Sequence, residues 1–308
     1  MSVPSPGLVQ SVHDRLVRLA HQRDFEPNLV FSRFAAERLL YRLSASRHVD
    51  RFVLKGAFLL VVWLGEAVRP TRDVDLLGFG NLPAEALREI FREICSLEVE
   101  PDGLVFPETE LRIAPIRRGD AFGGQRLVLW ALLGRARFRV QIDVAVGTMV
   151  TPPPEWVTYP TLLDLPSPRL RAYRPETSIA EKLHAMVDHG AQNSRLRDYF
   201  DLVTLARRER FDGRVLVDAL RDTFQSRDTR IPAGLPLGLT RAFAEIEGKR
   251  AQWRSFLTRS RLPVDWAELE TVIDEVAEFL GPVLTAASRE STLAAVWRPD
   301  GAWTEEDG

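Results

Sequence analysis

Residues 69–76 read Arg-Pro-Thr-Arg-Asp-Val-Asp-Leu, so two acids are separated by one apolar residue. On a β-strand, side chains two residues apart point to the same side. We therefore expect Asp73 and Asp75 on one face of a strand, with Val74 and Leu76 on the other. Two carboxylates on one face repel each other unless a cation lies between them, and oxygen ligands at this spacing suit Mg²⁺ or Mn²⁺. A pair of acids on the solvated edge of a sheet is the alternative interpretation.

Upstream of these acids, the turn Lys55-Gly56-Ala57 lies between a short apolar strand and a helix that runs through Trp63. A glycine lets the backbone come close to a phosphate, and the first N–H groups of a helix bind anions. The triphosphate of a nucleotide is expected at this turn.

Downstream, the segment Val140-Gln-Ile-Asp143-Val places a third acid among apolar residues. An unpaired charge there would be costly, so a metal ion is its predicted partner. A pair of ions held by Asp73, Asp75 and Asp143 would activate an attacking oxygen and neutralise a leaving pyrophosphate. A glycine turn and helix, then a strand with two acids, then a strand with one acid, is the order found in nucleotidyltransferase folds.

Hydrophobic periodicity predicts the elements around these motifs. Helices are expected over residues 9–23, 28–44, 83–97, 176–189, 195–208, 213–224, 239–257 and 266–284. Strands are expected over residues 51–54, 71–77, 109–117, 125–133 and 137–146, with a hairpin turn at Gly134-Arg135.

The prolines after residue 150 predict a boundary between two domains. The expected fold class is α+β, with residues 1–150 forming a mixed sheet flanked by helices. Residues 151–174 are a predicted Pro-rich linker, residues 175–298 a predicted all-helical domain, and residues 299–308 a predicted disordered tail.

The composition, with 45% hydrophobic and 27% charged residues, is that of an ordinary globular protein. A net charge of −2 argues against nucleic-acid binding by bulk charge, but seven arginines stand between Arg112 and Arg139 against one acid, Asp120. These arginines either contact an RNA backbone or simply alternate outward from a half-exposed sheet. Only three of the 41 basic residues are lysines, and Lys55 and Lys182 are two of them.

The sequence also predicts where the protein is found. No signal peptide is recognisable near Met1, and the longest apolar run, residues 57–64, is too short to span a membrane. The lone cysteine, Cys95, is expected to be a buried structural residue. We therefore expect a cytoplasmic protein that does not contact a membrane.

Three motifs together resemble the AbiEii/AbiGii toxin nucleotidyltransferases, the MenT-like proteins. They are Leu54-Lys-Gly-Ala57 with Arg69-Pro-Thr-Arg-Asp-Val-Asp-Leu76, then Glu181-Lys-Leu-His-Ala185, then Arg197-Asp-Tyr-Phe-Asp-Leu202. The resemblance covers about residues 30–210. It implies a DNA polymerase β-like nucleotidyltransferase fold with a helical C-terminal domain.

The resemblance also implies roles for single residues. Asp73 and Asp75 would hold the metals, Lys182 would contact the triphosphate, and Asp198 would be the essential acid of the last motif. The predicted nucleotide-binding set is Lys55, Gly56, Ala57, Arg72 and Lys182. The family commonly has Gly or Ser where this chain has Ala57. Thr71 is the position at which the resemblance suggests regulation. A phosphate there would place about two negative charges beside the metal-ligating acids and the incoming triphosphate, and would repel both.

The residues of the two later motifs, which lie on predicted helices, also have a purely structural interpretation. Lys182 is alternatively a solvated lysine paired with Glu181, and Asp198 and Asp201 are alternatively surface acids balanced by nearby arginines. We favour function for Asp198 and structure for Asp201. His184 is expected to be packed and hydrogen bonded.

The resemblance implies the toxin half of a toxin–antitoxin pair that acts in phage defence. Such a protein would transfer nucleotides from an NTP to RNA, in particular to the tRNA 3′ end, and so block translation. Its partners would be the NTP, the RNA acceptor and a cognate antitoxin encoded nearby. The alternatives are nucleotidylation of a protein or a small molecule such as an aminoglycoside, and a non-catalytic member that binds RNA or the antitoxin.

Overall fold

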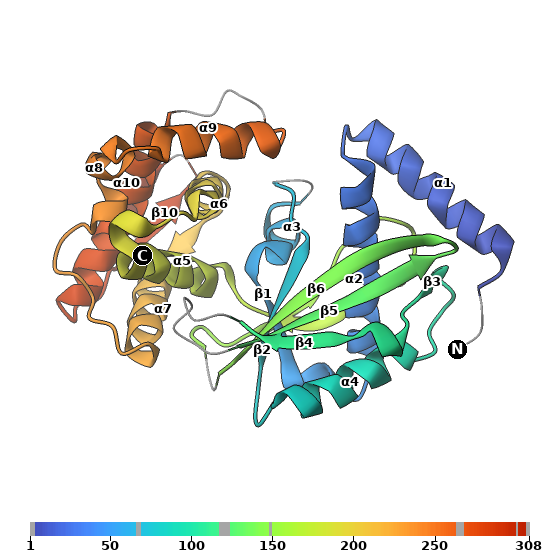
Figure 1. The fold of residues 1–308 in the computed structure, drawn as a ribbon. Coiled ribbons are helices and arrows are strands. Elements are labelled where there is room, and N and C mark those ends of the chain that lie inside the picture. Colours follow the sequence, from blue (N-terminus) through green and yellow to red (C-terminus); the bar gives the residue numbers. More distant parts are fainter. Residues whose placement is uncertain are drawn as a thin grey trace. The chain divides into compact units, whose positions relative to one another are not determined.

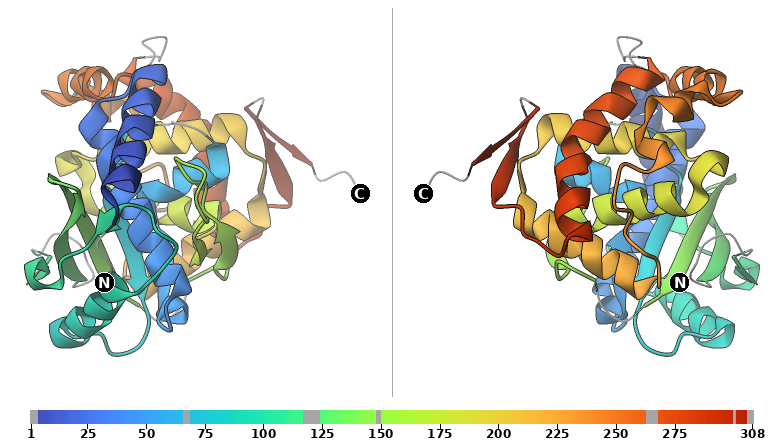
Figure 2. Two further views of the ribbon diagram at one scale, coloured as in Figure 1. Left: turned by 90° about the vertical axis from the view of Figure 1, so that its right-hand side faces the viewer. Right: turned by 90° about the vertical axis from the view of Figure 1, so that its left-hand side faces the viewer.

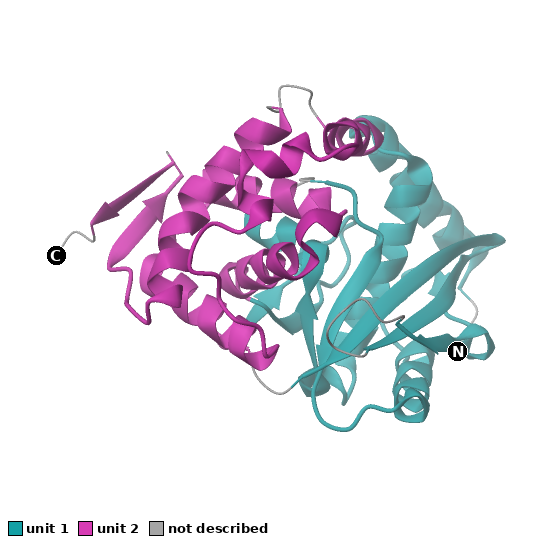
Figure 3. Cartoon of the chain, turned by 60° about the vertical axis from the view of Figure 1, so that its left-hand side comes forward, with its two compact units in different colours: residues 1–148, 154–173 teal, residues 149–153, 174–308 magenta. Residues whose placement is uncertain are grey.

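The computed structural model describes residues 4–65, 69–116, 124–147, 150–262, 268–299 and 301–305. The chain forms two compact units, shown in separate colours in Figure 3. Unit 1 comprises residues 1–148 and 154–173, and unit 2 comprises residues 149–153 and 174–308.

Unit 1 is a mixed sheet with helices. Its helices are α1 (Pro6–Gln22), α2 (Pro27–Ala45), α3 (Leu60–Leu64) and α4 (Ala84–Ser96), with 3₁₀ turns η1 (Val49–Arg51), η2 (Gly56–Leu59) and η3 (Glu108–Glu110). Its strands are β1 (Phe52–Lys55), β2 (Asp73–Gly78), β3 (Leu104–Val105), β4 (Arg112–Pro115), β5 (Gly124–Leu133), β6 (Ala136–Val146), β7 (Glu155–Thr158) and β8 (Arg169–Ala172).

The described strands of unit 1 form one eight-stranded sheet in the order β3-β5-β6-β2-β1-β8-β7, with β4 paired to β5. Figure 1 labels β1 to β6 of this sheet. Strand β2 runs antiparallel to β1 and parallel to β6, and β5 and β6 form a long antiparallel hairpin. The predicted mixed sheet is therefore confirmed, and β2, which carries the acid pair, lies near its centre.

The helices α2 and α4 cover one face of this sheet. Val74 and Leu76 of β2 and Ile142 of β6 line the same small apolar space as Leu40 of α2 and Phe91 of α4. The side chains of Val74 and Leu76 are both 1% exposed. Because side chains alternate along a strand, residues 73 and 75 of β2 lie on the opposite face.

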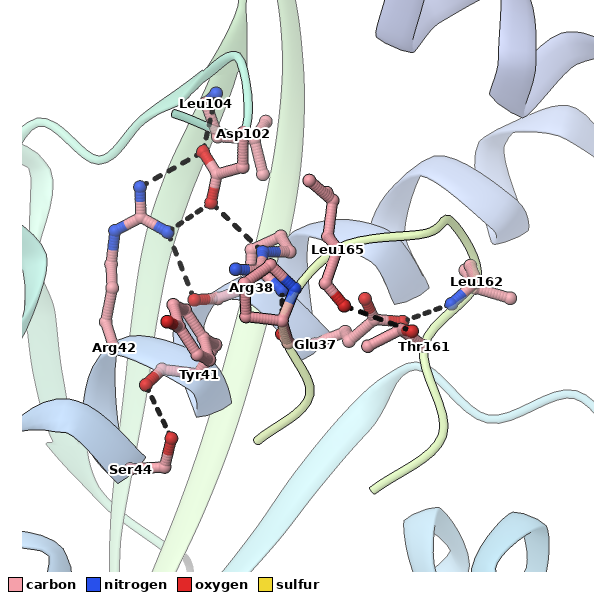
Figure 4. Close-up of polar contacts among 11 residues, drawn as sticks. Glu37, Arg38, Tyr41, Arg42, Ser44, Asp102, Leu104, Thr161, Leu162 and Leu165 are labelled. Atoms are coloured by element: carbon pink, nitrogen blue, oxygen red, sulfur yellow. Dashed lines mark hydrogen bonds and ion pairs between the residues drawn. The ribbon is translucent and has the colours of Figure 1, made fainter. Parts of the chain in front are cut away.

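A buried ion network fixes α2 against two loops of unit 1 (Figure 4). Asp102 accepts hydrogen bonds from Arg38 Nε at 3.1 Å and from Arg42 Nη1 at 2.6 Å, and all three side chains are almost fully buried. Glu37 Oε2 accepts a hydrogen bond from the backbone N–H of Leu162 at 2.8 Å. Burial raises the pKa of Glu37 to about 7. These contacts position the helix that supports the sheet beneath the acid pair.

The structure differs from the prediction of a linker over residues 151–174. Residues 154–173 belong to unit 1, where β8 pairs in parallel with β1 and antiparallel with β7. Prolines are tolerated at strand ends and near sheet edges, so the Pro-rich composition marks loops around these short strands rather than a chain without structure. The crossing from one unit to the other lies at residues 149–153 and at Arg174.

Unit 2 is mainly helical. Its helices are α5 (Pro175–His189), α6 (Leu196–Arg208), α7 (Gly213–Ser226), α8 (Arg241–Glu245), α9 (Lys249–Arg259) and α10 (Leu269–Ser288), with 3₁₀ turns η4 (Gly190–Gln192) and η5 (Leu237–Leu239). The helix predicted over residues 239–257 is two helices, because Gly248 adopts a φ of +83° immediately before α9 and interrupts the helical backbone.

Unit 2 is not all-helical, and Ala302–Glu305, within the segment predicted to be disordered, form a strand. Strands β9 (Phe211–Asp212), β10 (Ala295–Arg298) and β11 (Ala302–Glu305) form a small antiparallel sheet. The indole N–H of Trp297 donates to the carbonyl of Ala206 at 2.7 Å, and that of Trp303 donates to the carbonyl of Phe279 at 3.0 Å. Tertiary packing of two tryptophans thus orders a segment whose composition predicts disorder. Figure 2 shows this hairpin in red beside the helices of its unit.

No helix in the described part of the chain combines the length and the apolar content that a membrane span requires.

Candidate active site

The two acids of β2 share the face of the sheet that α2 and α4 leave uncovered. Asp73 is exposed and Asp75 is half-buried, whereas Val74 and Leu76 between and beyond them are buried. Leu76 and Val74 anchor the strand in the core, and this anchoring fixes the direction of both carboxylates. The geometry is that expected from the sequence.

The turn at Gly56 lies directly against Asp75. In the β1–β2 ladder Lys55 is paired with Asp75, and Gly56 follows with a φ of +73°. A Cβ atom placed on Gly56 would lie 2.8 Å from Asp75 Cγ, well inside van der Waals contact. Glycine is therefore required both for the backbone conformation and for the close approach of the acid.

The segment after Gly56 is helical through Trp63, as predicted. It begins as the 3₁₀ turn η2, which contains the half-buried Ala57, and continues as the five-residue helix α3. The side chain of Lys55, at the end of β1, lies with its Nζ 5.1 Å from the centre of the Tyr173 ring. Because residues directly opposite each other on antiparallel strands point to the same face, Lys55 shares the sheet face that carries Asp75.

The charge of Asp143 is paired with an arginine of the protein. The sequence-based argument that only a metal ion could balance this charge is therefore wrong. Arg126 of β5 donates two hydrogen bonds to its carboxylate, from Nε at 2.8 Å and from Nη2 at 2.6 Å. Asp143 is also the parallel-strand neighbour of Asp75. The hydrogen bonds to Asp143 raise the pKa of Arg126, and the charges of Asp73 and Asp75 add to that shift. Asp143 therefore lies beside Asp75 in a bidentate ion pair with Arg126, and its role as a metal ligand stays a prediction.

Arg126 is the residue of this site that sequence reasoning missed. The signal was present in the predicted hairpin: a two-residue turn at Gly134-Arg135 pairs Leu133 with Ala136, and counting back along both strands sets Arg126 opposite Asp143. A bidentate guanidinium across an antiparallel pair is a strong interaction, because both hydrogen bonds carry charge.

The carboxylates of Asp73 and Asp75 fit a magnesium ion that is also bound by the substrate. Among the described residues, no group of three or more His, Cys, Asp or Glu side chains is arranged to hold a metal. Mg²⁺, however, is usually bound through one or two carboxylates together with substrate phosphates and water. Asp73 and Asp75 supply such a pair of carboxylates beside the Gly56 turn, so they fit an ion that a bound triphosphate would help to ligate.

The two residues before β2 have different environments. Arg72 is exposed, and its Nη2 lies 3.1 Å from Glu26 Oε2, a carboxylate that also accepts the first N–H groups of α2. Thr71 is half-buried and stands two residues before Asp73. Nucleotide binding by Arg72 and phosphorylation of Thr71 stay predictions.

Lys182 lies in unit 2, in a buried cluster with two aspartates. Its Nζ is 2.7 Å from Asp198 Oδ1 and 2.6 Å from Asp201 Oδ2. The three side chains are 13%, 9% and 0% exposed, respectively. Lys182 on α5 and the two acids on α6 therefore form a compact charge cluster between two packed helices. This arrangement excludes a solvated lysine and surface acids.

The neighbours of Lys182 on α5 have partners of their own. Glu181 pairs with Arg227 at 2.9 Å. His184 Nε2 lies 3.0 Å from Thr229 Oγ1, and its ring meets that of Phe224 edge to face. Burial lowers the pKa of His184 to about 4, so the ring is neutral at pH 7. His184 is packed and hydrogen bonded, as predicted.

The chain matches the family described as nucleotidyl transferase AbiEii toxin, type IV toxin–antitoxin system, over residues 38–294. No curated protein is significantly similar to it in sequence. Two crystal structures from Helicobacter pylori are similar in fold. One is JHP933, with 15% identity and a TM-score of 0.42, covering 93% of this chain and 94% of the other. The second, a candidate nucleotidyltransferase, has 15% identity and a TM-score of 0.41, covering 93% of this chain and 96% of the other.

The family match extends over the acid pair, the lysine of α5 and the acids of α6. The chain belongs to the AbiEii family of nucleotidyl transferase toxins of type IV toxin–antitoxin systems.

Proposed function

We propose that this nucleotidyl transferase moves a nucleotide from an NTP to the 3′-hydroxyl of an RNA, with tRNA as the first acceptor to test. The observation that carries the proposal is the contact between the Gly56 turn and Asp75. It sets a backbone able to approach phosphates closely beside two carboxylates on one face of a strand.

Asp73 and Asp75 are the residues that would hold Mg²⁺. When bound, the ion would neutralise charge on the triphosphate and on the departing pyrophosphate. The half-buried position of Asp75 and the anchoring of β2 by Val74 and Leu76 preorganise the two carboxylates. Preorganised charge of this kind is the main source of catalysis in phosphoryl transfer.

The chain's own contribution to the reaction is to position the nucleotide. The backbone at Gly56 and the ammonium of Lys55 would contact the phosphates, and the pairing of Lys55 with Asp75 in the β1–β2 ladder supports this role. The RNA 3′-oxygen would bond to the α-phosphorus while the bond from that phosphorus to the bridging oxygen breaks and pyrophosphate leaves. Alignment of the two reactants lowers the entropic part of the barrier.

The roles of Lys182 and Asp198 rest on the resemblance. The cluster supports a role for the two aspartates in positioning Lys182, because Asp198 and Asp201 both accept hydrogen bonds from its ammonium group and hold it in one place. Contact between Lys182 and the triphosphate is part of the proposal.

The biological effect would follow from the acceptor. A nucleotide added to the tRNA 3′ end blocks aminoacylation and so stops translation. Membership of a toxin–antitoxin family implies an antitoxin partner, and we propose that its gene lies next to that of this protein.

The test is a transfer assay with the purified protein, Mg²⁺, total tRNA and each α-³²P-labelled NTP in turn, resolved on a denaturing gel. We expect label on tRNA, and a loss of at least about 100-fold in Asp75→Asn, equivalent to about 2.7 kcal/mol of barrier. Glu155→Gln is the matched control, because Glu155 is an exposed carboxylate on β7 of the same unit. Label on protein or on a small molecule instead of RNA would overturn the proposed acceptor, and equal transfer by Asp75→Asn would overturn the site.

A further inference from the structure

The hairpin β5–β6 has one covered face and one open face within unit 1. Phe138 of β6 stacks on Phe31 of α2 with ring centres 4.8 Å apart, and Val140 and Ile142 are buried on the same side. Because side chains alternate along a strand, Arg137 and Arg139 point to the opposite face, and both are exposed.

This open face is continuous with the acid pair. Across the hairpin, Trp130 is opposite Arg139, and Arg126 is opposite Asp143. Asp143 in turn neighbours Asp75 on β2. With a rise of about 3.3 Å per residue, the four steps from Arg139 to Asp143 span about 13 Å along β6. A chain lying along the strand would therefore reach from the arginines to the acid pair.

The chemistry of the open face is aromatic and basic. The guanidinium of Arg137 lies 4.8 Å from the centre of the Trp130 ring and pairs with Glu110. Arg139 donates a hydrogen bond to Gln141 Oε1 at 2.8 Å, and this amide oxygen does not neutralise the charge of the guanidinium. Trp130 is only half-buried, unlike Trp253 and Trp297, which are 1% and 3% exposed.

An aromatic side chain between arginines on an open sheet face is the arrangement used to bind single-stranded nucleic acid. Bases stack on the ring and phosphates pair with the guanidinium groups, with no need for a particular sequence. Arg117 and Arg118, which belong to the same basic run in the sequence, lie outside the described residues.

We propose that the open face of β5–β6, defined by Trp130, Arg137 and Arg139, binds the unpaired 3′ segment of the RNA acceptor. The segment would stack a base on Trp130 and lead its terminal hydroxyl toward Asp73 and Asp75. This inference rests on the proposed function and adds the surface that recognises the acceptor. A protein partner is disfavoured, because the face leads into the acid pair and offers a half-buried ring beside cations rather than a broad apolar patch.

The experiment measures binding apart from chemistry. A fluorescein-labelled, unpaired RNA of about ten nucleotides, a length within the usual site sizes, is titrated into the Asp75→Asn protein and followed by anisotropy. Trp130→Ala and Arg139→Gln are then added to this background. Arg92→Gln is the matched control, because Arg92 is exposed on α4, which covers the other face of the sheet.

We expect Trp130→Ala to weaken RNA binding by about 5- to 150-fold, the range seen for removal of a stacking ring. Arg139→Gln should reduce the slope of log K against log salt by about 0.7, the loss of one phosphate contact on a single strand. Arg92→Gln should change neither. In proteins with an intact Asp75, the first two changes should raise the KM for RNA and leave the KM for the NTP unchanged.

Binding and KM equal to those of the parent protein in Trp130→Ala and Arg139→Gln, with transfer still dependent on Asp75, would overturn this surface and leave the proposed function intact. Loss of antitoxin binding with unchanged RNA binding would assign the face to the protein partner and also overturn the proposal. Absence of both RNA binding and RNA labelling in the parent protein would overturn the proposed function itself.

Discussion

Gly56 and Asp75 are packed so closely that no side chain fits between them. Gly56 has a φ of +73°, and a Cβ atom on it would lie 2.8 Å from Asp75 Cγ and 2.9 Å from Asp75 Cβ. The turn and the acid are therefore one structural unit, and a change at either residue displaces the other.

Gly56→Ala is expected to abolish detectable nucleotidyl transfer. The methyl group must push the Asp75 carboxylate away from its position, and the positive φ adds backbone strain of about 1 kcal/mol or more. Gly80→Ala is the control, because Gly80 has a φ of +82° but nothing within 4 Å of the added carbon. Both variants should lose similar stability from strain, whereas only Gly56→Ala should lose transfer. Equal activity of the two variants would show that the contact with Asp75 has no role.

Asp143→Asn is expected to reduce transfer by less than about tenfold, far less than Asp75→Asn, because Arg126 already holds its carboxylate. The rates of the two variants are compared under single-turnover conditions at saturating Mg²⁺. A loss in Asp143→Asn as large as that in Asp75→Asn would instead make Asp143 a third metal ligand, with Arg126 displaced when the ion binds.

Lys182→Met is expected to destabilise the protein by about 3–5 kcal/mol, since it leaves Asp198 and Asp201 buried without their shared cation. Urea denaturation followed by circular dichroism measures this loss. Adding Asp198→Asn and Asp201→Asn to Lys182→Met should recover most of it, because amides carry no charge to desolvate. A Lys182→Met protein as stable as the parent would contradict the role of the cluster in holding α5 to α6.

Glu37→Gln is expected to make the protein more stable at pH 8 while changing little at pH 4.5. Burial raises the pKa of Glu37 from 4.5 to about 7, so the folded state keeps a proton that the unfolded state releases. The stability contributed by this proton is fully present below pH 4.5 and is lost as the pH rises to about 7, a difference of about 3 kcal/mol. Glutamine has no proton to lose and retains the oxygen that accepts from Leu162.

The measurement for Glu37 is the free energy of unfolding of both proteins between pH 4.5 and pH 8. The parent should lose stability relative to the variant across this range. Parallel curves for the two proteins would show that Glu37 keeps an ordinary pKa in the folded state.

The local geometry of the acid pair was predictable from sequence, and so were most elements. The alternation of side chains along β2 puts Asp73 and Asp75 on one face, and the apolar side chains of Val74 and Leu76 determine that the opposite face is buried. The two-residue turn after Leu133 sets the register of the hairpin. These features depend on backbone geometry over a few residues, and a sequence contains that information directly.

Contacts between distant segments were decided by the tertiary structure. The partners of Lys182 come from another helix, β8 joins the sheet beside β1, and the C-terminal hairpin is ordered by Trp297 and Trp303. Each depends on which surfaces pack together across many residues of chain. Periodicity and composition describe a segment's own preferences, whereas the free energy of burying one segment against another exists only once both are folded together.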